Sequence, residues 1–318
     1  MLRFCTLFDM RYATRALAML ESLEAHCRVP KAVTILALDD QVPLLLARLG
    51  RPEWRVLRVA DLQDEELSAL EQTRPRREFC WTCAPALSHH MVHTADTGDT
   101  VIYVDADLLF FADPANLLEE LGEDGNILIH EHRYSPDRIQ WESGSGRFNV
   151  GFVAFRVGDE ARACTGRWRG QVLERCELDP EHGYCGDQGY LDEWPKRYPG
   201  LRIMQNIGGG TAPWNVTAYE VGGSASQPTV DGVPVTFFHY HAFRTVAVRP
   251  FGMIAAQPAG GYDFDRHAIR ILFRNYAKRI RVLTRRVARA GFALAADVHL
   301  SPRDAVRGWR SGRCIPAI

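Results

Sequence analysis

Residues 101–114 read VIYVDADLLFFADP, and this stretch predicts a buried strand of a central sheet. The apolar and β-branched run that ends at Asp105 is typical of a buried strand. A second carboxylate, Asp107, follows two residues later. Because side chains two residues apart on an extended backbone point the same way, both carboxylates can face one point just past the strand. Open α/β sheets bind their ligands at that end of the strands.

The two carboxylates predict a metal site. Carboxylates that face one point repel each other, and burying one without a partner is costly. A divalent cation would relieve this repulsion. Oxygen ligands favour Mg²⁺ or Mn²⁺, and a cation with open coordination positions suits a phosphate. The alternative is a surface turn with two solvated aspartates, but the apolar runs on both sides favour the metal site.

Short apolar runs alternate with helical patterns along most of the chain. This alternation predicts an α/β fold with a mixed, mostly parallel, doubly wound sheet and flanking helices. We expect strands over residues 3–8, 33–38, 54–59, 101–105, 127–130, 148–156, 201–207 and 235–239. We expect helices over residues 12–26, 43–49, 85–92, 114–121, 163–176 and 266–290.

The composition is that of an ordinary soluble globular protein. The 318 residues are 46% hydrophobic and 24% charged. No segment has the pattern of a signal peptide or the length of a membrane span, which predicts a cytoplasmic location. The eight cysteines are too few for a disulfide scaffold in a chain of this length. Cys80 and Cys83 form a C-x-x-C with no second pair at zinc spacing, which favours buried structural thiols.

Charge is distributed unevenly along the chain. Residues 1–242 hold 23 Lys and Arg against 35 Asp and Glu, a net charge of −12, whereas residues 243–318 hold 15 against 4, a net charge of +11. The apolar stripe of residues 266–290 is surrounded by arginines. Such a basic amphipathic helix packs on an acidic body or lies on an anionic membrane surface. Sparse aromatic residues and the acidic body argue against nucleic-acid binding.

Further polar side chains lie at strand ends or in tight turns. Glycines flank Asp187 and Gln188, which indicates a tight backbone that presents both side chains. Asn149 lies at the start of an expected strand. His239 and His241 end the last strand, and either could complete the metal site. Capped or solvated histidines are the alternative.

Two segments before and after the carboxylates could contact a ligand. Arg74, Arg76 and Arg77 precede an aromatic pair and could hold a diphosphate. A solvated basic loop is the alternative. Residues 134–147 are polar and contain glycine, and they are long enough to form a flexible lid.

Four segments of the chain, in this order, resemble motifs of the GT-A fold nucleotide-diphospho-sugar transferases, in particular retaining glycosyltransferase family 8. They read YVDADLLFFADP, RFNVGF, GDQGYLD and FFHYHAF. The strings EFCWTCAPAL and APWNV resemble those of uncharacterised bacterial members of this fold. The resemblance covers roughly residues 1–245. It implies a GT-A domain over residues 1–245 and a basic helical extension over residues 246–318.

The resemblance implies ligands for the metal and contacts for the nucleotide. Asp105, Asp107 and His239 would hold Mn²⁺ or Mg²⁺, with His241 as the competing ligand. Residues 4–9 would lie under the base of a nucleotide, and Thr6 and Asp9 would contact it.

The resemblance also implies the residues around the donor sugar. Arg77 would lie near the diphosphate or the donor sugar, while Asn149, Asp187 and Gln188 would surround the reacting carbon. Two positions depart from the family pattern. Ala242 stands where the family usually has glycine, and Arg244 is the nearest cation to the usual phosphate-binding lysine.

The implied activity is transfer of a sugar from a nucleotide-diphosphate sugar, with a UDP-sugar as the expected donor, to a glycan or lipid-linked acceptor of the cell envelope, with retention of configuration. In such a reaction the leaving phosphate oxygen takes the acceptor proton. A sugar-phosphate nucleotidyltransferase is an alternative, but residues 9–13 lack the glycine-rich loop that it would need. A non-catalytic binding protein would be expected to lose the acidic ligands. We further expect peripheral contact of residues 262–290 with the inner face of an anionic membrane.

Overall fold

The computed structural model describes residues 1–179 and 184–316, which form two compact units. Unit 1 contains Met1–Met10, Cys27–Ala106 and Pro114–Asn206. Unit 2 contains Arg11–His26, Asp107–Asp113 and Ile207–Ile318. The chain therefore passes from one unit to the other directly after Ala106. The expected domain boundary between residues 245 and 246 stays a prediction.

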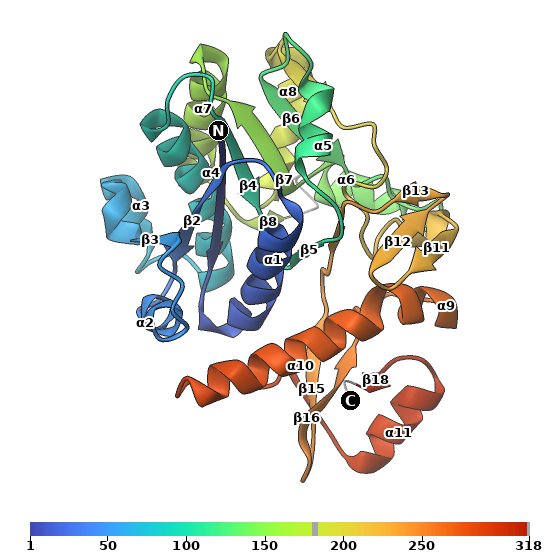
Figure 1. Cartoon of the computed structure of the whole chain (residues 1–318). Coiled ribbons are helices and arrows are strands. Elements are labelled where there is room, and N and C mark those ends of the chain that lie inside the picture. The colour runs from blue at the N-terminus through green and yellow to red at the C-terminus, as the bar shows by residue number, and fades with distance from the viewer. Residues whose placement is uncertain (180–183, 317–318) are drawn as a thin grey trace. The chain divides into compact units, whose positions relative to one another are not determined.

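Unit 1 is built on a seven-stranded sheet in the order β10-β6-β7-β4-β1-β2-β3 (Figure 1). Strand β7 runs antiparallel to both of its neighbours, and the other pairs are parallel. This confirms the predicted mixed, mostly parallel sheet. The strands are β1 (Leu2–Phe8), β2 (Lys31–Ala37), β3 (Trp54–Arg58), β4 (Thr100–Val104), β6 (Ile127–Glu131), β7 (Phe148–Arg156) and β10 (Leu201–Ile203).

The core of unit 1 lies between the sheet and its two longest helices. These are α4 (Arg76–Thr94) and α7 (Asp159–Glu174), which pack on each other. Their buried faces join the central strands in one apolar cluster, which includes Trp168 and Trp194 with ring centroids 5.3 Å apart. The central strands are buried on both faces, which is why they are continuous apolar runs.

The shorter elements of unit 1 connect the strands. Asp64 caps α3 by accepting from the Leu67 amide at 3.0 Å. Helix α4 begins nine residues earlier than the sequence predicts, because Pro85 lies inside the helix and not at its start. The elements are α2 (Gln41–Arg48), α3 (Glu65–Leu70), α5 (Ala115–Leu118), α6 (Glu142–Ser145), α8 (Trp194–Arg197), β8 (Leu178–Asp179) and β9 (Tyr184–Cys185).

Unit 2 combines one early helix with the last third of the chain. Helix α1 (Ala13–His26) packs on β5 (Leu108–Phe110), which pairs antiparallel with β14 (Phe237–His239). A second sheet has the order β17-β15-β16-β18. Its strands and the other elements of the unit are β11 (Val221–Ser224), β12 (Gln227–Val230), β13 (Val233–Pro234), β15 (Arg244–Val248), β16 (Gly252–Gln257), β17 (Val298–Leu300), β18 (Ile315–Pro316), α9 (Arg266–Ala268), α10 (Arg274–Arg289) and α11 (Pro302–Arg310).

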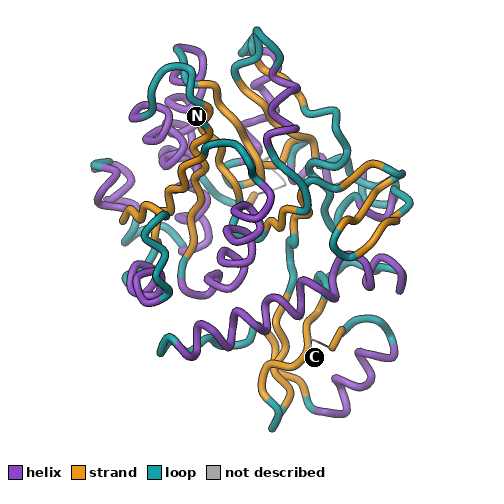
Figure 2. Tube along the Cα trace, in the orientation of Figure 1, coloured by secondary structure: helices purple, strands orange, loops and turns teal. Residues whose placement is uncertain are grey.

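The predicted basic helix forms, and its apolar stripe is buried inside unit 2. It consists of α9, a π-turn over Ile269–Phe273 and α10 (Figure 2). Arg286 and Arg279 of α10 pair with Glu21 of α1. The helix therefore packs on an acidic partner within its own unit, which is one of the two alternatives that the sequence left open. No helix of residues 1–179 and 184–316 is both long and apolar enough to span a bilayer.

Candidate active site

Two neighbouring strands of unit 1 bring predicted site residues to the same end of the sheet, where β4 ends and β7 begins. Asp105 directly follows β4, and its amide donates to the Gly151 carbonyl of β7 at 3.0 Å. Because β7 runs opposite to β4, the start of β7 lies beside the end of β4. Asn149 is therefore placed near Asp105 by strand pairing. The Tyr103 hydroxyl donates to Asp105 Oδ1 at 2.9 Å and orients that carboxylate.

The Asn149 amide is held in one orientation. Its Oδ1 accepts from the Gly151 amide at 2.9 Å. Its Nδ2 lies 3.3 Å from His132 Nε2 and 3.2 Å from Gln188 Oε1. Since an amide nitrogen only donates, His132 Nε2 accepts, and the neutral tautomer protonated on Nδ1 fits this contact. Asn149 and Gln188, predicted to lie around one carbon, are in direct contact.

Gln188 is fixed from its other side as well. Its Nε2 donates to the Ser145 carbonyl at 2.9 Å and to Cys185 Sγ at 3.2 Å. Ser145 belongs to α6, within the predicted lid of residues 134–147. That segment contains a 3₁₀ turn and a short helix, so it is more regular than a flexible loop.

Asp187 is buried and lies near a second carboxylate. Its side chain is 4% exposed, and burial followed by repulsion from Asp105 raises its pKa well above the usual range. Its carbonyl accepts from Trp168 Nε1 at 2.9 Å. Perturbed carboxylates of this kind cluster at functional sites, where a cation or a developing positive charge can relieve them.

The tight turn predicted before Asp187 requires glycine at position 186 for steric reasons. Gly186 has a φ of +56°, and a Cβ there would lie 2.8 Å from the Trp81 ring. The Arg77 guanidinium lies over the same Trp81 ring, 5.0 Å from its centroid. Arg77 is exposed in the first turn of α4, so it lies on a helix and not in a loop. Its predicted contact with a diphosphate stays a prediction.

The other two arginines of this group have different roles. Arg74 donates to Thr82 and to the Val172 and Leu173 carbonyls, so it joins α4 to the end of α7. Arg76 donates to the Leu38 carbonyl at 2.6 Å, and its Nε lies 3.7 Å from Asp9 Oδ2.

The predicted nucleotide contacts lie at the end of β1. Thr6 is 1% exposed, and its Oγ1 has no hydrogen-bond partner in the part of the chain that the structure describes. Asp9 is buried beside Arg76, one of the three arginines expected to hold a diphosphate. Contacts of Thr6 and Asp9 with a nucleotide stay predictions.

In unit 2, the pairing of β5 with β14 places a histidine beside the second carboxylate. In this pair His239 lies opposite Leu108, and Leu108 is the residue that directly follows Asp107. His239 Nε2 lies 3.1 Å from Asp107 Oδ1, and both side chains are buried. The apolar LLF and FFH segments thus explain why two residues far apart in sequence meet.

The pKa of Asp107 shifts in the opposite direction to that of Asp187. Burial alone would raise the pKa of Asp107, but the charge and hydrogen bond of His239 take it below its usual value. The Trp214 ring flanks both histidines, with centroids 5.1 Å from His239 and 5.6 Å from His241. His241 is exposed, and its ring centroid lies 6.1 Å from that of His239.

Asp105, Asp107 and His239 form a group that could hold a metal ion. One ligand atom from each lies within 4.8 Å of the others. Because only Ala106 separates the two aspartates, the chain itself keeps their Cα atoms within about 7 Å. Two carboxylate oxygens and one imidazole nitrogen are suitable donors for Mn²⁺ or Mg²⁺.

Ala242, the departure from the family pattern, has a φ of +57°. This left-handed backbone favours glycine, so the family's usual residue would fit here without strain. Arg244 is exposed at the start of β15.

Several residues near the site were not identified from the sequence. Trp214 lies in the APWNV string, whose resemblance was noted without a role. His132 directly follows β6, so its place after a strand could have marked it. Tyr103 and Cys185 contact Asp105 and Gln188, which lie two and three residues further along the chain, and no motif distinguishes either residue.

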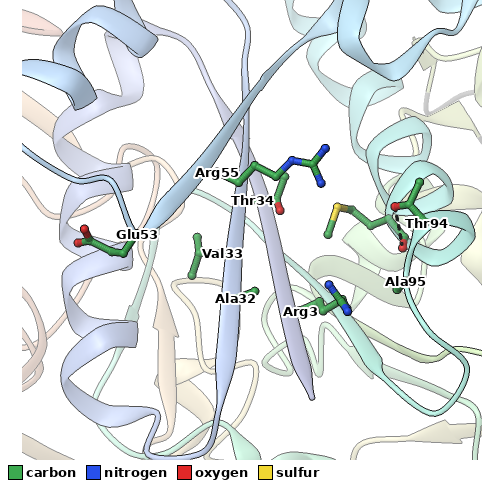
Figure 3. A pocket seen from close by; sticks show the side chains of 9 residues that line it. Arg3, Ala32, Val33, Thr34, Glu53, Arg55, Thr94 and Ala95 are labelled. Carbon is green, nitrogen blue, oxygen red and sulfur yellow. Dashed lines mark hydrogen bonds between the residues drawn. The ribbon is translucent and has the colours of Figure 1, made fainter.

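A cavity of about 140 Å³ lies elsewhere in unit 1, near the amino ends of β1 and β2 (Figure 3). None of the predicted site residues lines it. Ligands of open α/β sheets bind at the opposite, carboxyl ends of the strands. The lining residues are Arg3, Ala32, Val33, Thr34, Glu53, Arg55, Met91, Thr94 and Ala95.

Solved structures with some likeness to the chain include two sugar transferases. The galactosyltransferase LgtC, in complex with donor and acceptor sugar analogs, is 17% identical with a TM-score of 0.49. The match covers 75% of this chain and 86% of LgtC. Mouse xyloside xylosyltransferase 1 is 14% identical with a TM-score of 0.48, over 74% of this chain and 96% of that one. These likenesses are loose.

Sequence comparison gives a nearer relative. No family model matches the chain. The uncharacterized protein YfnD of Bacillus subtilis (strain 168) is 30% identical over 252 residues, which are 79% of this chain and 80% of YfnD. The chain therefore belongs to the same protein family as YfnD.

Proposed function

We propose that the protein is a metal-dependent glycosyltransferase that moves a sugar from a nucleotide-diphosphate sugar, a UDP-sugar, to a glycan or lipid-linked acceptor. The observation that carries this proposal is the group of Asp105, Asp107 and His239 after an apolar strand. The motif resemblance to family 8 adds the donor class and retention of configuration.

The residues present fit a divalent metal. Asp105, Asp107 and His239 would hold it, with His241 as the second candidate imidazole. The 3.1 Å contact of Asp107 with His239 shows that a carboxylate and an imidazole already face each other. A bound Mn²⁺ or Mg²⁺ would supply Lewis-acid stabilisation of a leaving diphosphate.

The residues of unit 1 would bind and orient the donor sugar. Asn149 and Gln188 form a fixed pair of amides, so their outward polar groups would be preorganised. Asp187 would place negative charge where a sugar carbon becomes positive as its bond to the diphosphate breaks. Thr6, Asp9 and Arg77 would contact the nucleotide and its phosphates.

A thermal-shift panel tests this function. UDP, GDP, CDP and ADP are each added with and without Mn²⁺, for the wild type and for Asp107→Asn. A ligand at 100 times its dissociation constant stabilises the folded state by about 2.7 kcal/mol. We expect a shift with UDP that requires Mn²⁺ and disappears in Asp107→Asn. No shift with any nucleotide, or a shift that survives Asp107→Asn, would show that the assignment is wrong.

We also propose peripheral contact of the basic helix with an anionic membrane. Residues 266–289 contain no Asp or Glu. The exposed cations lie mostly four residues apart, on one side of the helix: Arg266, Arg270, Arg274, Lys278, Arg285 and Arg289.

Charge reversal tests the membrane contact better than truncation, because truncation would remove the buried stripe of α10 from unit 2. The triple variant Lys278→Glu, Arg285→Glu, Arg289→Glu should lose sedimentation with vesicles of phosphatidylglycerol. The wild type should bind these vesicles and release them at high salt. Equal binding by both proteins would overturn the proposal.

A further inference from the structure

An exposed tryptophan lies beside the amide network of unit 1. Trp141 is 39% exposed, and it directly precedes α6. Ser145 at the other end of α6 accepts the hydrogen bond from Gln188. Four helical residues rise about 6 Å, so Trp141 lies roughly one turn from the carbonyl that holds Gln188.

A row of aromatic rings joins Trp141 to the other amide. Tyr134 stacks on His132, with centroids 4.7 Å apart and an interplanar angle of 11°. Trp141 contacts Tyr134 edge-on, at 6.4 Å and 79°. His132 is the residue that contacts Asn149. Trp141 is thus connected to both Asn149 and Gln188, through two independent sets of contacts.

The surroundings of Trp141 are polar. Gln140 and Glu142 are exposed on either side of it, and the Arg138 guanidinium lies over the ring, 5.8 Å from its centroid. Ile139 is the other exposed large apolar side chain of this segment, at 55%. Two apolar side chains are too few to bury a lipid chain, since interaction patches for apolar partners cover several hundred Å².

This mixture of one aromatic face and a polar rim matches the surface of a sugar ring. One face of a pyranose presents C–H groups, which pack on the electron-rich face of an indole, while its rim carries hydroxyl groups. Charged and amide side chains beside the indole can hydrogen-bond those hydroxyls.

We infer that Trp141 and Tyr134 form an acceptor subsite, in which Trp141 stacks on a sugar ring next to Gln188. The inference rests on the proposed function and adds to it the chemical class of the acceptor's reacting end, which is a carbohydrate. Trp141 is a specificity-determining residue for the acceptor and has no part in nucleotide binding.

Saturation-transfer difference NMR on the full chain tests this subsite. The probes are a panel of methyl pyranosides (gluco, galacto and manno, both anomers) and n-octyl β-D-glucoside below its micelle concentration. In the wild type we expect transfer to ring C–H protons of at least one methyl pyranoside. Trp141→Ala should reduce that signal at least fivefold, and Trp141→Phe should restore most of it.

Ile139→Ser is the matched control, because it removes an exposed apolar side chain from the same turn without removing an aromatic face. It should keep the ring-proton signals. All variants should keep the Mn²⁺-dependent nucleotide shift of the wild type, which shows that they are folded.

The outcomes separate the subsite from the proposed function. Equal ring-proton signals in the wild type and Trp141→Ala would overturn the subsite. Signals confined to the alkyl chain of octyl glucoside, or no signal from any probe while the nucleotide shift persists, would also overturn it. Loss of the pyranoside signal in Trp141→Ala without any nucleotide shift in the wild type would support a sugar subsite and contradict the glycosyltransferase.

Discussion

Asp187 of unit 1 and Asp107 of unit 2 are both buried aspartates, yet their pKa values move in opposite directions. Burial and the neighbouring carboxylate Asp105 raise the pKa of Asp187. Burial also acts on Asp107, but its neighbour is His239, which lowers the pKa. Burial raises the pKa of both groups, and only at Asp107 does a partner, His239, outweigh it.

The two buried aspartates differ in whether a neighbouring group balances their negative charge. Asp107 and His239 form a balanced pair, which stabilises unit 2 without a ligand. Asp187 and Asp105 repel each other, so unit 1 holds electrostatic strain that a positive ligand would relieve. Sites that bind charged ligands commonly sacrifice stability in this way. The four predictions below test this contrast.

The largest effect is expected from His239→Ala. Removing the imidazole leaves Asp107 buried without its partner, which should lower the free energy of unfolding by about 3 kcal/mol. The variant should also lose Mn²⁺-dependent UDP affinity by about 100-fold or more, since even residues that only orient metal ligands contribute about 10- to 100-fold. Urea unfolding and calorimetric titration measure the two effects.

His241→Ala is the control for this variant. The exposed His241 should contribute less than about 0.5 kcal/mol to stability. Similar losses of metal-dependent affinity in both variants would mean that both imidazoles are ligands.

Gly186→Ala should have the next largest effect. The added Cβ would lie 2.8 Å from Trp81 at a φ of +56°, so we expect a loss of about 2 kcal/mol in urea unfolding, together with weakened donor binding. Gly98→Ala separates the two causes, because Gly98 has a φ of +91° with nothing within 4 Å of the added Cβ. Equal costs at both positions would exclude the contact with Trp81 as the cause.

Asp187→Asn should stabilise the metal-free protein while abolishing transfer. The folded pKa is raised, so the contribution of Asp187 to stability is present below the unfolded value near 3.8 and is lost as pH rises through the folded pKa. Replacing the ionisable carboxyl should therefore increase the free energy of unfolding at pH 7, measured by urea titration in a chelator.

Asp107→Asn should change the free energy of unfolding in the opposite direction. Its folded pKa is lowered, so its contribution is present above 3.8 and is lost as pH falls through the folded pKa. The variant should be less stable than the wild type at pH 7. If both substitutions changed stability in the same direction, the contrast between the two aspartates would be incorrect.

Arg77→Ala should have the smallest effect on stability. Arg77 is exposed on the Trp81 ring, and its removal should change the free energy of unfolding by about 0.5 kcal/mol. Nucleotide affinity should fall about threefold to tenfold if the guanidinium contacts a phosphate. Arg77→Lys keeps the charge but not the planar stacking, so a full recovery by lysine would assign the effect to charge alone.

Local patterns were enough to predict all seven strands of the sheet in unit 1, in their order along the chain. Residues 148–156 form a strand with the predicted bounds, and the strand before Asp105 is buried as its apolar run indicated. These elements follow from the spacing of apolar residues along the chain, and that spacing does not depend on how the elements pack together. The four motifs were recognisable for the same reason, since each is a short segment at the end of one element.

Which of these segments meet depends on contacts that form only in the folded chain. The pairing of β5 with β14 brought His239, rather than His241, into hydrogen-bond distance of Asp107. The pairing of β7 with β4 and the turn at Gly186 determined the neighbours of Asp187, and with them the direction of its pKa. Register and neighbouring charges depend on contacts between residues far apart in sequence, and spacing along one chain carries no direct information about them.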